Sequence, residues 1–113
     1  MPEPRAPLPV AVLISGRGSN LQALTDSFGT PGSPVKIVLV LSNRPEAPGL
    51  ERAAKAGLKT EIVDHNAFAT REDFDVALDR EIRAAGAEFV ALAGFMRLLT
   101  PQFVTAWKDR MVN

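Results

Sequence analysis

The sequence predicts an α/β fold with a doubly wound parallel sheet, and three observations carry this prediction. Four apolar runs alternate along the chain with segments of helical periodicity. The runs at 10–14, 35–41 and 89–93 are nearly continuous in Val, Ile, Leu and Ala, which is typical of strands covered on both faces. The 113 residues are enough for one domain. We therefore expect right-handed βαβ units and the strand order 3-2-1-4.

The first half of the chain holds a leader, two strands and two helices in this prediction. Pro at positions 2, 4, 7 and 9 indicates a disordered or extended leader over residues 1–9. The first helix follows Asn20 and shares an apolar face: Leu21, Leu24 and Phe28. Pro48 suits the first turn of the second helix, and Gly57 suits the position just after its end. Residues 29–34 predict a Gly/Pro/Ser loop.

The second half repeats the alternation. Residues 60–63 predict a short third strand, and Thr70 with Asp73 resembles a capping box at the start of the third helix. That helix repeats apolar residues every four positions: Phe74, Leu78 and Ile82. Thr100 and Pro101 suit the N-cap and first position of the last helix. Its apolar side is predicted from three residues: Phe103, Val104 and Trp107.

Residues 111–113 look like the beginning of another strand. We expect the strand at 89–93 to have no neighbour within this chain, which leaves an apolar edge that pairs between molecules. The prediction is therefore a homo-oligomer or edge-to-edge association of the 113-residue chain, measurable by light scattering.

Composition limits the partners of the protein. Lys and Arg total 13 and Asp and Glu total 13, so charge gives no reason to expect nucleic acid or an anionic membrane. The chain has no cysteine, which excludes disulfides, thiolate zinc sites and a thiol nucleophile and fits a cytosolic enzyme. No apolar run approaches the roughly 20 residues that span a bilayer. We expect a cytoplasmic protein.

The glycine-rich loop SGRGSN joins the first strand to the first helix. The N-terminus of a helix offers unpaired N–H groups and about half a positive charge, which favours an anion. The P-loop pattern is absent, and the dinucleotide pattern fails at its third glycine, which is Leu21, although Arg44 suits an NADP 2′-phosphate. Two interpretations remain: a phosphomonoester held by Gly18, Ser19 and Asn20, or a plain turn with Ser19 as the helix cap.

A second unusual loop, AGFMRLL, follows the fourth strand. Phe95 and Met96 are large apolar residues beside the lone cation Arg97, and such a cluster either packs in a core or lines a site. In a 3-2-1-4 sheet, the loops after strands 1 and 4 face one crevice where ligands bind. A phosphate cradle opposite an apolar wall with an arginine predicts two ligands. One is a phosphorylated small molecule, and the other is flat, apolar and acid-tailed.

Four segments together resemble a known family: VAVLISGRGSNLQAL, VLSNRPEAPGLERAAKAG, FATREDFD and ALAGFMRLLTPQFV. They are similar to the glycinamide ribonucleotide formyltransferases, which use 10-formyltetrahydrofolate in purine biosynthesis. The resemblance runs over residues 10–113 and implies a Rossmann-like formyltransferase fold.

The resemblance also implies roles for matching positions. The residues that match the phosphate-binding segment are Gly18, Ser19 and Asn20. The residues that match the folate site are Arg71, Met96, Arg97, Leu98 and Leu99. Asn113 matches the first residue of the N-x-H catalytic segment, whose histidine, with a later aspartate, would lie beyond it. His65 follows the third strand in an unrelated segment and reads as a surface histidine.

The implied reaction moves a formyl group from 10-formyltetrahydrofolate to the amine of glycinamide ribonucleotide, and it requires no metal. Residues 10–113 would be the N-terminal, phosphate-binding part of that domain, and the 113 residues alone would be inactive. Two alternatives stay open. The Gly-x-Gly turn and Arg44 favour an NADP-binding oxidoreductase domain, and the same fold could also serve a non-catalytic binding module.

Overall fold

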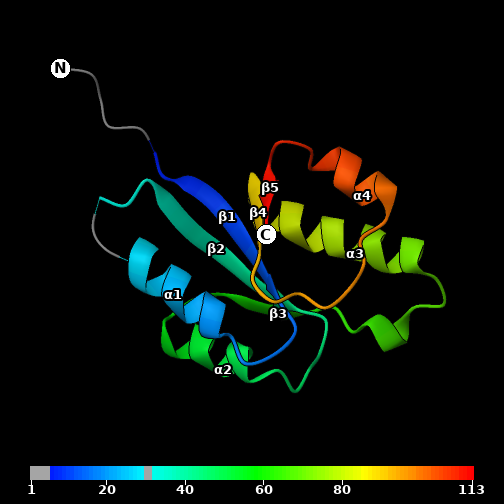
Figure 1. The fold of residues 1–113 in the computed structure, drawn as a ribbon, viewed down its shortest axis with the longest axis horizontal. Coiled ribbons are helices and arrows are strands. Elements are labelled where there is room, and N and C mark those ends of the chain that lie inside the picture. The colour runs from blue at the N-terminus through cyan, green and yellow to red at the C-terminus, as the bar shows by residue number, and fades with distance from the viewer. Residues whose placement is uncertain (1–5, 30–31) are drawn as a thin grey trace.

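A five-stranded parallel sheet with helices on both faces forms the described part of the chain (Figure 1). The computed structural model describes residues 6–29 and 32–113. The strands lie in the order β3-β2-β1-β4-β5, and each neighbouring pair is parallel. The predicted order 3-2-1-4 is therefore confirmed, and a fifth strand extends it.

The elements alternate along the chain as predicted. In order they are β1 (Leu8–Ile14), α1 (Ser19–Phe28), β2 (Val35–Ser42), α2 (Pro48–Lys55), β3 (Thr60–Ile62), the 3₁₀ turn η1 (His65–Ala67), α3 (Arg71–Ala84), β4 (Phe89–Leu92), α4 (Pro101–Ala106) and β5 (Met111–Val112). Strand β1 begins at Leu8, inside the segment predicted as a leader. Residues 1–5 of that leader and residues 30–31 of the predicted 29–34 loop lie outside the described residues.

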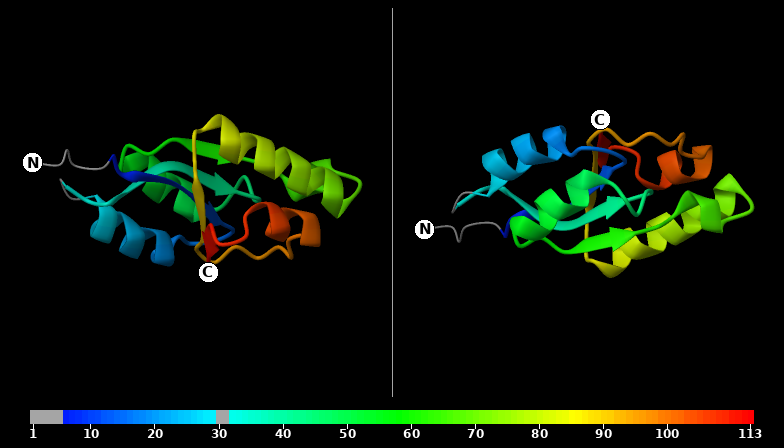
Figure 2. Two further views of the ribbon diagram at one scale, coloured as in Figure 1. Left: turned by 90° about the horizontal axis from the view of Figure 1, so that it is seen from above. Right: turned by 90° about the horizontal axis from the view of Figure 1, so that it is seen from below.

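Alternate residues of β1 supply two separate cores, because successive side chains of a strand point to opposite faces. Ala11 and Leu13 pack against α3 and α4, together with the predicted residues Phe74, Leu78 and Ile82. Val10, Val12 and Ile14 pack against α1 and α2. Figure 2 shows α1 and α3 on opposite sides of the sheet. Both faces of β1 are thus covered, which explains its unbroken apolar sequence.

The predicted helix starts are confirmed at three places. Thr70 Oγ1 accepts from the N–H of Asp73 at 3.1 Å, and Thr100 Oγ1 accepts from the N–H of Phe103 at 3.2 Å. Pro48 is the first residue of α2. On the last helix, Phe103 and Trp107 are buried as predicted, but Val104 is exposed because only one side of this six-residue helix faces the sheet. No helix in residues 6–29 and 32–113 combines the length and apolarity that crossing a bilayer requires.

The expectation of an unpaired β4 edge is wrong. Residues Met111 and Val112 form β5 and pair with Val90 and Ala91 of β4. The chain returns to the sheet because the backbone turns sharply after α4, where Asp109 takes a left-handed conformation with φ of 65°. The N–H of Val90 then donates to the carbonyl of Arg110 at 2.8 Å. A two-residue strand therefore covers the middle of the apolar edge.

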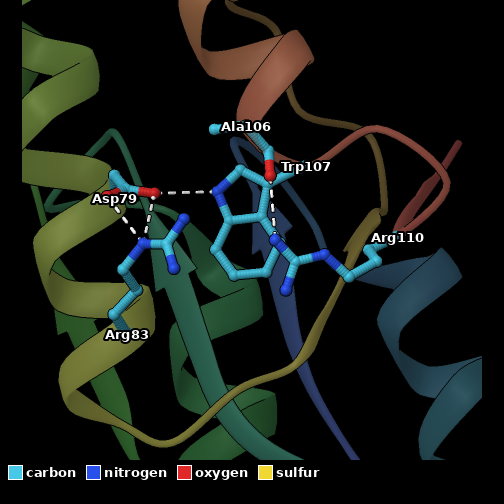
Figure 3. Close-up of polar contacts among 5 residues, drawn as sticks. All are labelled: Asp79, Arg83, Ala106, Trp107 and Arg110. Atoms are coloured by element: carbon cyan, nitrogen blue, oxygen red, sulfur yellow. Dashed lines mark hydrogen bonds and ion pairs between the residues drawn. The ribbon is translucent and has the colours of Figure 1, made fainter.

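Trp107 anchors this turn to α3. Its side chain is fully buried, and its indole N–H donates to Asp79 Oδ1 at 2.8 Å. Asp79 also pairs with Arg83 at 2.9 Å. The guanidinium groups of Arg83 and Arg110 lie 4.8 and 4.7 Å from the indole centroid, within cation–π range (Figure 3). These contacts fix the start of β5 relative to α3.

Candidate functional site

The loop after β1 is held tightly against α2. Gly18 has φ of +78°, and a Cβ at this position would lie 2.7 Å from the Cα of Gly49. The N–H of Gly49 donates to the carbonyl of Gly16 at 3.0 Å. A Cβ on Gly49 would itself lie 2.6 Å from Ile14 Cδ1. The loop thus needs glycine at 18 for its conformation, and glycine at both 18 and 49 for the close approach.

The first turn of α1 presents polar groups to solvent. Ser19 and Asn20 are its first two residues and are exposed. The first helical hydrogen bond runs from Gln22 N–H to the Gly18 carbonyl at 2.8 Å, and α-helix geometry leaves the preceding N–H groups unpaired. Within the described residues no side chain caps α1, and its first turn holds no acid. The interpretation of Ser19 as the helix cap is wrong, because Gly18 occupies the N-cap position.

The loop after β4 is an exposed apolar wall with one cation. Met96 and Leu98 are each 73% exposed, whereas Phe95 and Leu99 pack against the core below them. The interpretation of the whole cluster as core is therefore wrong for Met96 and Leu98. Arg97 is half-buried, its guanidinium carbon lies 5.7 Å from the Phe74 ring centroid, and its Nε has no partner among the described residues. Exposed apolar side chains that form one contiguous patch mark an interaction surface.

The two loops meet, as the predicted sheet order requires. The N–H of Met96 donates to Ser15 Oγ at 2.7 Å, across 81 positions of the chain. Farther along the second loop, the N–H of Thr100 donates to the buried Asp75 Oδ2 at 2.6 Å, which ties the loop to α3. The loop between these two anchors carries the exposed wall.

The remaining predicted site residues lie around this edge. Arg71 is the first residue of α3, three positions before Phe74, and it is exposed. Asn113 follows β5 and is exposed. Because β5 runs parallel to β4, Asn113 leaves the sheet at the same edge as the loops after β1 and β4.

Sequence reasoning missed four residues at this edge. Ser15 Oγ donates to Asn43 Oδ1 at 2.5 Å, and His65 Nδ1 lies 3.2 Å from Asn43 Nδ2 and 3.1 Å from the Asn43 carbonyl oxygen. His65 is half-buried rather than a free surface histidine. Ser15 and Asn43 each directly follow an apolar strand, and a polar residue at that position is a signal that the sequence offers. Gly49 lies inside a helix, where glycine is disfavoured, and this is a second signal. In the described ranges, no three His, Cys, Asp or Glu side chains gather around a possible metal position.

The fold and the site together define a doubly wound α/β protein with its ligand edge at the carboxyl ends of β1 and β4. The family model described as formyl transferase matches residues 8–113. The chain therefore belongs to the formyl transferase family. This membership removes the alternative of an NADP-binding oxidoreductase domain.

Individual relatives agree with this assignment. The chain is 44% identical over 104 residues to the phosphoribosylglycinamide formyltransferase of Escherichia coli, covering 92% of this chain and 49% of that protein. It is 51% identical over 106 residues to the trifunctional purine biosynthetic protein adenosine-3 of Drosophila pseudoobscura pseudoobscura, covering 92% of this chain and 8% of that protein. The structure of the phosphoribosylglycinamide formyltransferase from Coxiella burnetii superposes with a TM-score of 0.88 at 42% identity, covering 94% of this chain and 50% of that one. The chain thus spans about half the length of the Escherichia coli and Coxiella burnetii proteins.

Proposed function

We propose that the protein carrying this chain transfers the formyl group of 10-formyltetrahydrofolate to the amine of glycinamide ribonucleotide, in de novo purine biosynthesis in the cytoplasm. The observation that carries the proposal is the Met96–Ser15 hydrogen bond of 2.7 Å, which joins an anion-binding turn to an exposed apolar wall. Two substrates of these two chemistries fit the two sides. The names of the relatives at 44% and 42% identity support the same reaction.

The turn at the start of α1 takes the phosphate of glycinamide ribonucleotide in this proposal. Gly18, Ser19 and Asn20 offer N–H groups at the positive end of the helix dipole, and Ser19 and Asn20 add a hydroxyl and an amide. Arg17 is exposed beside them and stays outside the assignment. A phosphate at this position would complete the uncapped end of α1.

The wall after β4 takes the folate. Exposed Met96 and Leu98 supply apolar contacts for a flat ring system, and Leu99 supports them from the core. Arg97, whose Nε has no partner among the described residues, and Arg71 supply positive charge for an acidic tail. The folate supplies the formyl group when it is bound, and the residues of this chain hold and orient it.

Asn113 acts at the reacting carbon in this proposal. An amide N–H placed there hydrogen-bonds the oxygen on which negative charge develops, and loss of one such donor costs about 3–4 kcal/mol of barrier. Residues 10–113 then serve as the substrate-binding part of the domain, and the proton transfers fall to residues outside them. Holding both substrates at one edge supplies the proximity that the reaction needs.

The test is a charge placed at the phosphate turn. Ser19→Asp puts a carboxylate at the N-terminus of α1, which should stabilise the helix by about 0.3–1 kcal/mol while repelling the phosphate. We expect calorimetry on the full-length protein to show weakened glycinamide ribonucleotide binding together with a raised midpoint of urea unfolding. A role in folding alone would move both readouts in the same direction.

Ser27→Asp is the matched control, because Ser27 is an exposed serine in the last turn of the same helix. It should lower stability by a similar amount and leave ligand binding unchanged. Wild-type binding by the Ser19→Asp variant would contradict the phosphate assignment. A wild-type protein that binds both substrates without formyl transfer would instead be a non-catalytic binding module.

A further inference from the structure

A row of hydrogen-bonded groups crosses the ligand edge of the sheet, and the proposed function uses only its link between Met96 and Ser15. The four residues are His65, Asn43, Ser15 and Met96, which lie beyond β3, β2, β1 and β4. Their order in space is the order of the strands in the sheet. We propose that Asn43 is a positioning residue that fixes the distance between the phosphate turn and the folate wall.

Hydrogen bonds link the neighbouring residues of the row. Ser15 Oγ accepts from the N–H of Met96 at 2.7 Å and donates its own proton to Asn43 Oδ1 at 2.5 Å. The amide Nδ2 of Asn43 donates to His65 Nδ1 at 3.2 Å when the ring carries its proton on Nε2. Asn43 thus sets the direction in which the Ser15 hydroxyl points. It thereby also sets which lone pair of Ser15 Oγ accepts from the N–H of Met96.

Burial makes this row stiff. Asn43 is 1% exposed and Ser15 is 3% exposed, so water does not replace a lost partner freely. A buried polar group without its hydrogen bond costs roughly 1–3 kcal/mol, which penalises any sliding of one loop past the other. Ser15 is the first residue of the glycine-rich loop, and Met96 is the first exposed apolar side chain of the wall. The Ser15 side chain therefore connects the two substrate-holding loops directly, and Asn43 holds that side chain in its orientation.

The consequence is specific for the reaction of two bound substrates. No residue proposed to contact glycinamide ribonucleotide also contacts the folate, so loss of the row should leave each separate affinity close to the wild-type value. The position of one bound substrate relative to the other should change, and a misplacement of about 1 Å lowers the rate by as much as 100-fold. This inference rests on the proposed formyl transfer between the two loops.

The experiment compares Asn43→Leu with Ser42→Ala in the full-length protein. Leucine has a similar size to asparagine and makes no hydrogen bond to Ser15 or His65. Ser42 is a neighbouring, fully buried residue whose hydroxyl bonds only within its own turn, to the carbonyl and N–H of Arg44 at 2.8 and 3.0 Å. Its loss should lower stability without removing a hydrogen bond of the row.

Single-turnover formyl transfer is measured with both substrates saturating, beside calorimetric binding of each substrate alone. We expect Asn43→Leu to lose about 10-fold to 100-fold in the rate constant with both affinities retained, and Ser42→Ala to keep the wild-type rate. Should Asn43→Leu fail to fold, Ser15→Ala breaks the same row from its centre with a smaller change and should show the same loss. The double variant should be no slower than the more affected single variant, because both act through one row.

Two results would overturn the proposal. A folded Asn43→Leu variant, or Ser15→Ala in its place, that reacts at the rate of Ser42→Ala would show that the row does not position the substrates. A wild-type protein that binds neither substrate or transfers no formyl group would overturn the proposed function and this inference with it. The Ser42→Ala variant separates these two results. Its activity shows that the protein transfers the formyl group, so an unchanged rate in Asn43→Leu then counts against the positioning role alone.

Discussion

Replacement of Gly18 by alanine tests the close approach between the phosphate turn and α2. The new methyl group would meet two separate obstacles. The backbone has φ of +78°, a left-handed conformation that costs an L-residue roughly 1–2 kcal/mol. The Cβ would also stand 2.7 Å from the Cα of Gly49, which is backbone and cannot rotate away.

The size of the second effect can be isolated with Gly57→Ala. Gly57 has φ of +77°, nearly the same as Gly18, but its Cβ would meet nothing within 4 Å. Both variants therefore share the backbone strain. Both also gain about 0.4–1 kcal/mol of stability, because alanine lowers the conformational entropy of the unfolded chain. The difference between them is the overlap with Gly49. Overpacking of this kind costs about 1–3 kcal/mol, so Gly18→Ala should be less stable than Gly57→Ala by that amount.

Urea unfolding followed by the fluorescence of Trp107 measures both variants, since Trp107 is fully buried. Gly18→Ala should also lose affinity for glycinamide ribonucleotide, because the turn must move away from α2. Gly57 lies after α2 and away from the turn, so its variant should bind normally. Equal unfolding free energies for the two variants would refute the reasoning that the Gly18–Gly49 contact leaves no space for a Cβ.

Three further predictions concern single contacts. Asp79→Ala leaves the buried indole N–H of Trp107 without its acceptor and should cost about 1–3 kcal/mol in urea unfolding, whereas Asp79→Asn keeps an acceptor and should cost less. Thr100→Ala removes the cap of α4 and should lower the unfolding free energy by about 1 kcal/mol in the same assay. Arg97→Met keeps a long apolar stem over Phe74 but removes the charge, so titration should show weaker folate binding with unchanged glycinamide ribonucleotide binding.

The positions of strands and helices could be predicted because their signals are local. Buried parallel strands read as apolar runs, and Phe74, Leu78 and Ile82 repeat at the spacing of one helix face and are buried. The start of β1 could not be predicted in this way. Leu8 donates to the Pro34 carbonyl at 2.8 Å and pairs with Val35, so the partner strand extends β1 into a segment whose prolines indicate a leader. Proline is tolerated there, at the beginning of a strand.

Residues 111–113 begin a strand as the sequence predicts, but its pairing with β4 within this chain could not be predicted, for the same kind of reason. Nothing in the local sequence of residues 107–110 indicates a return to the sheet, because Asp109 takes a positive φ that usually belongs to glycine. The return depends on long-range contacts: the indole N–H of Trp107 reaches Asp79, 28 positions earlier in the chain. Such contacts have no periodicity from which a sequence could reveal them.

In the candidate site too, features formed by adjacent residues could be predicted, whereas contacts between distant residues could not. The glycines and the polar first turn of α1 are adjacent in sequence, so the turn that we propose for the phosphate could be predicted as one uncapped helix start. The row through Asn43 joins residues 28 and 22 positions apart, and its last donor is a backbone N–H, which carries no information on residue type. Yet a parallel sheet places the residues that follow adjacent strands at one edge. Polar residues that directly follow two buried neighbouring strands, as Ser15 and Asn43 do, therefore form a sequence signal for a row of this kind once the strand order is known.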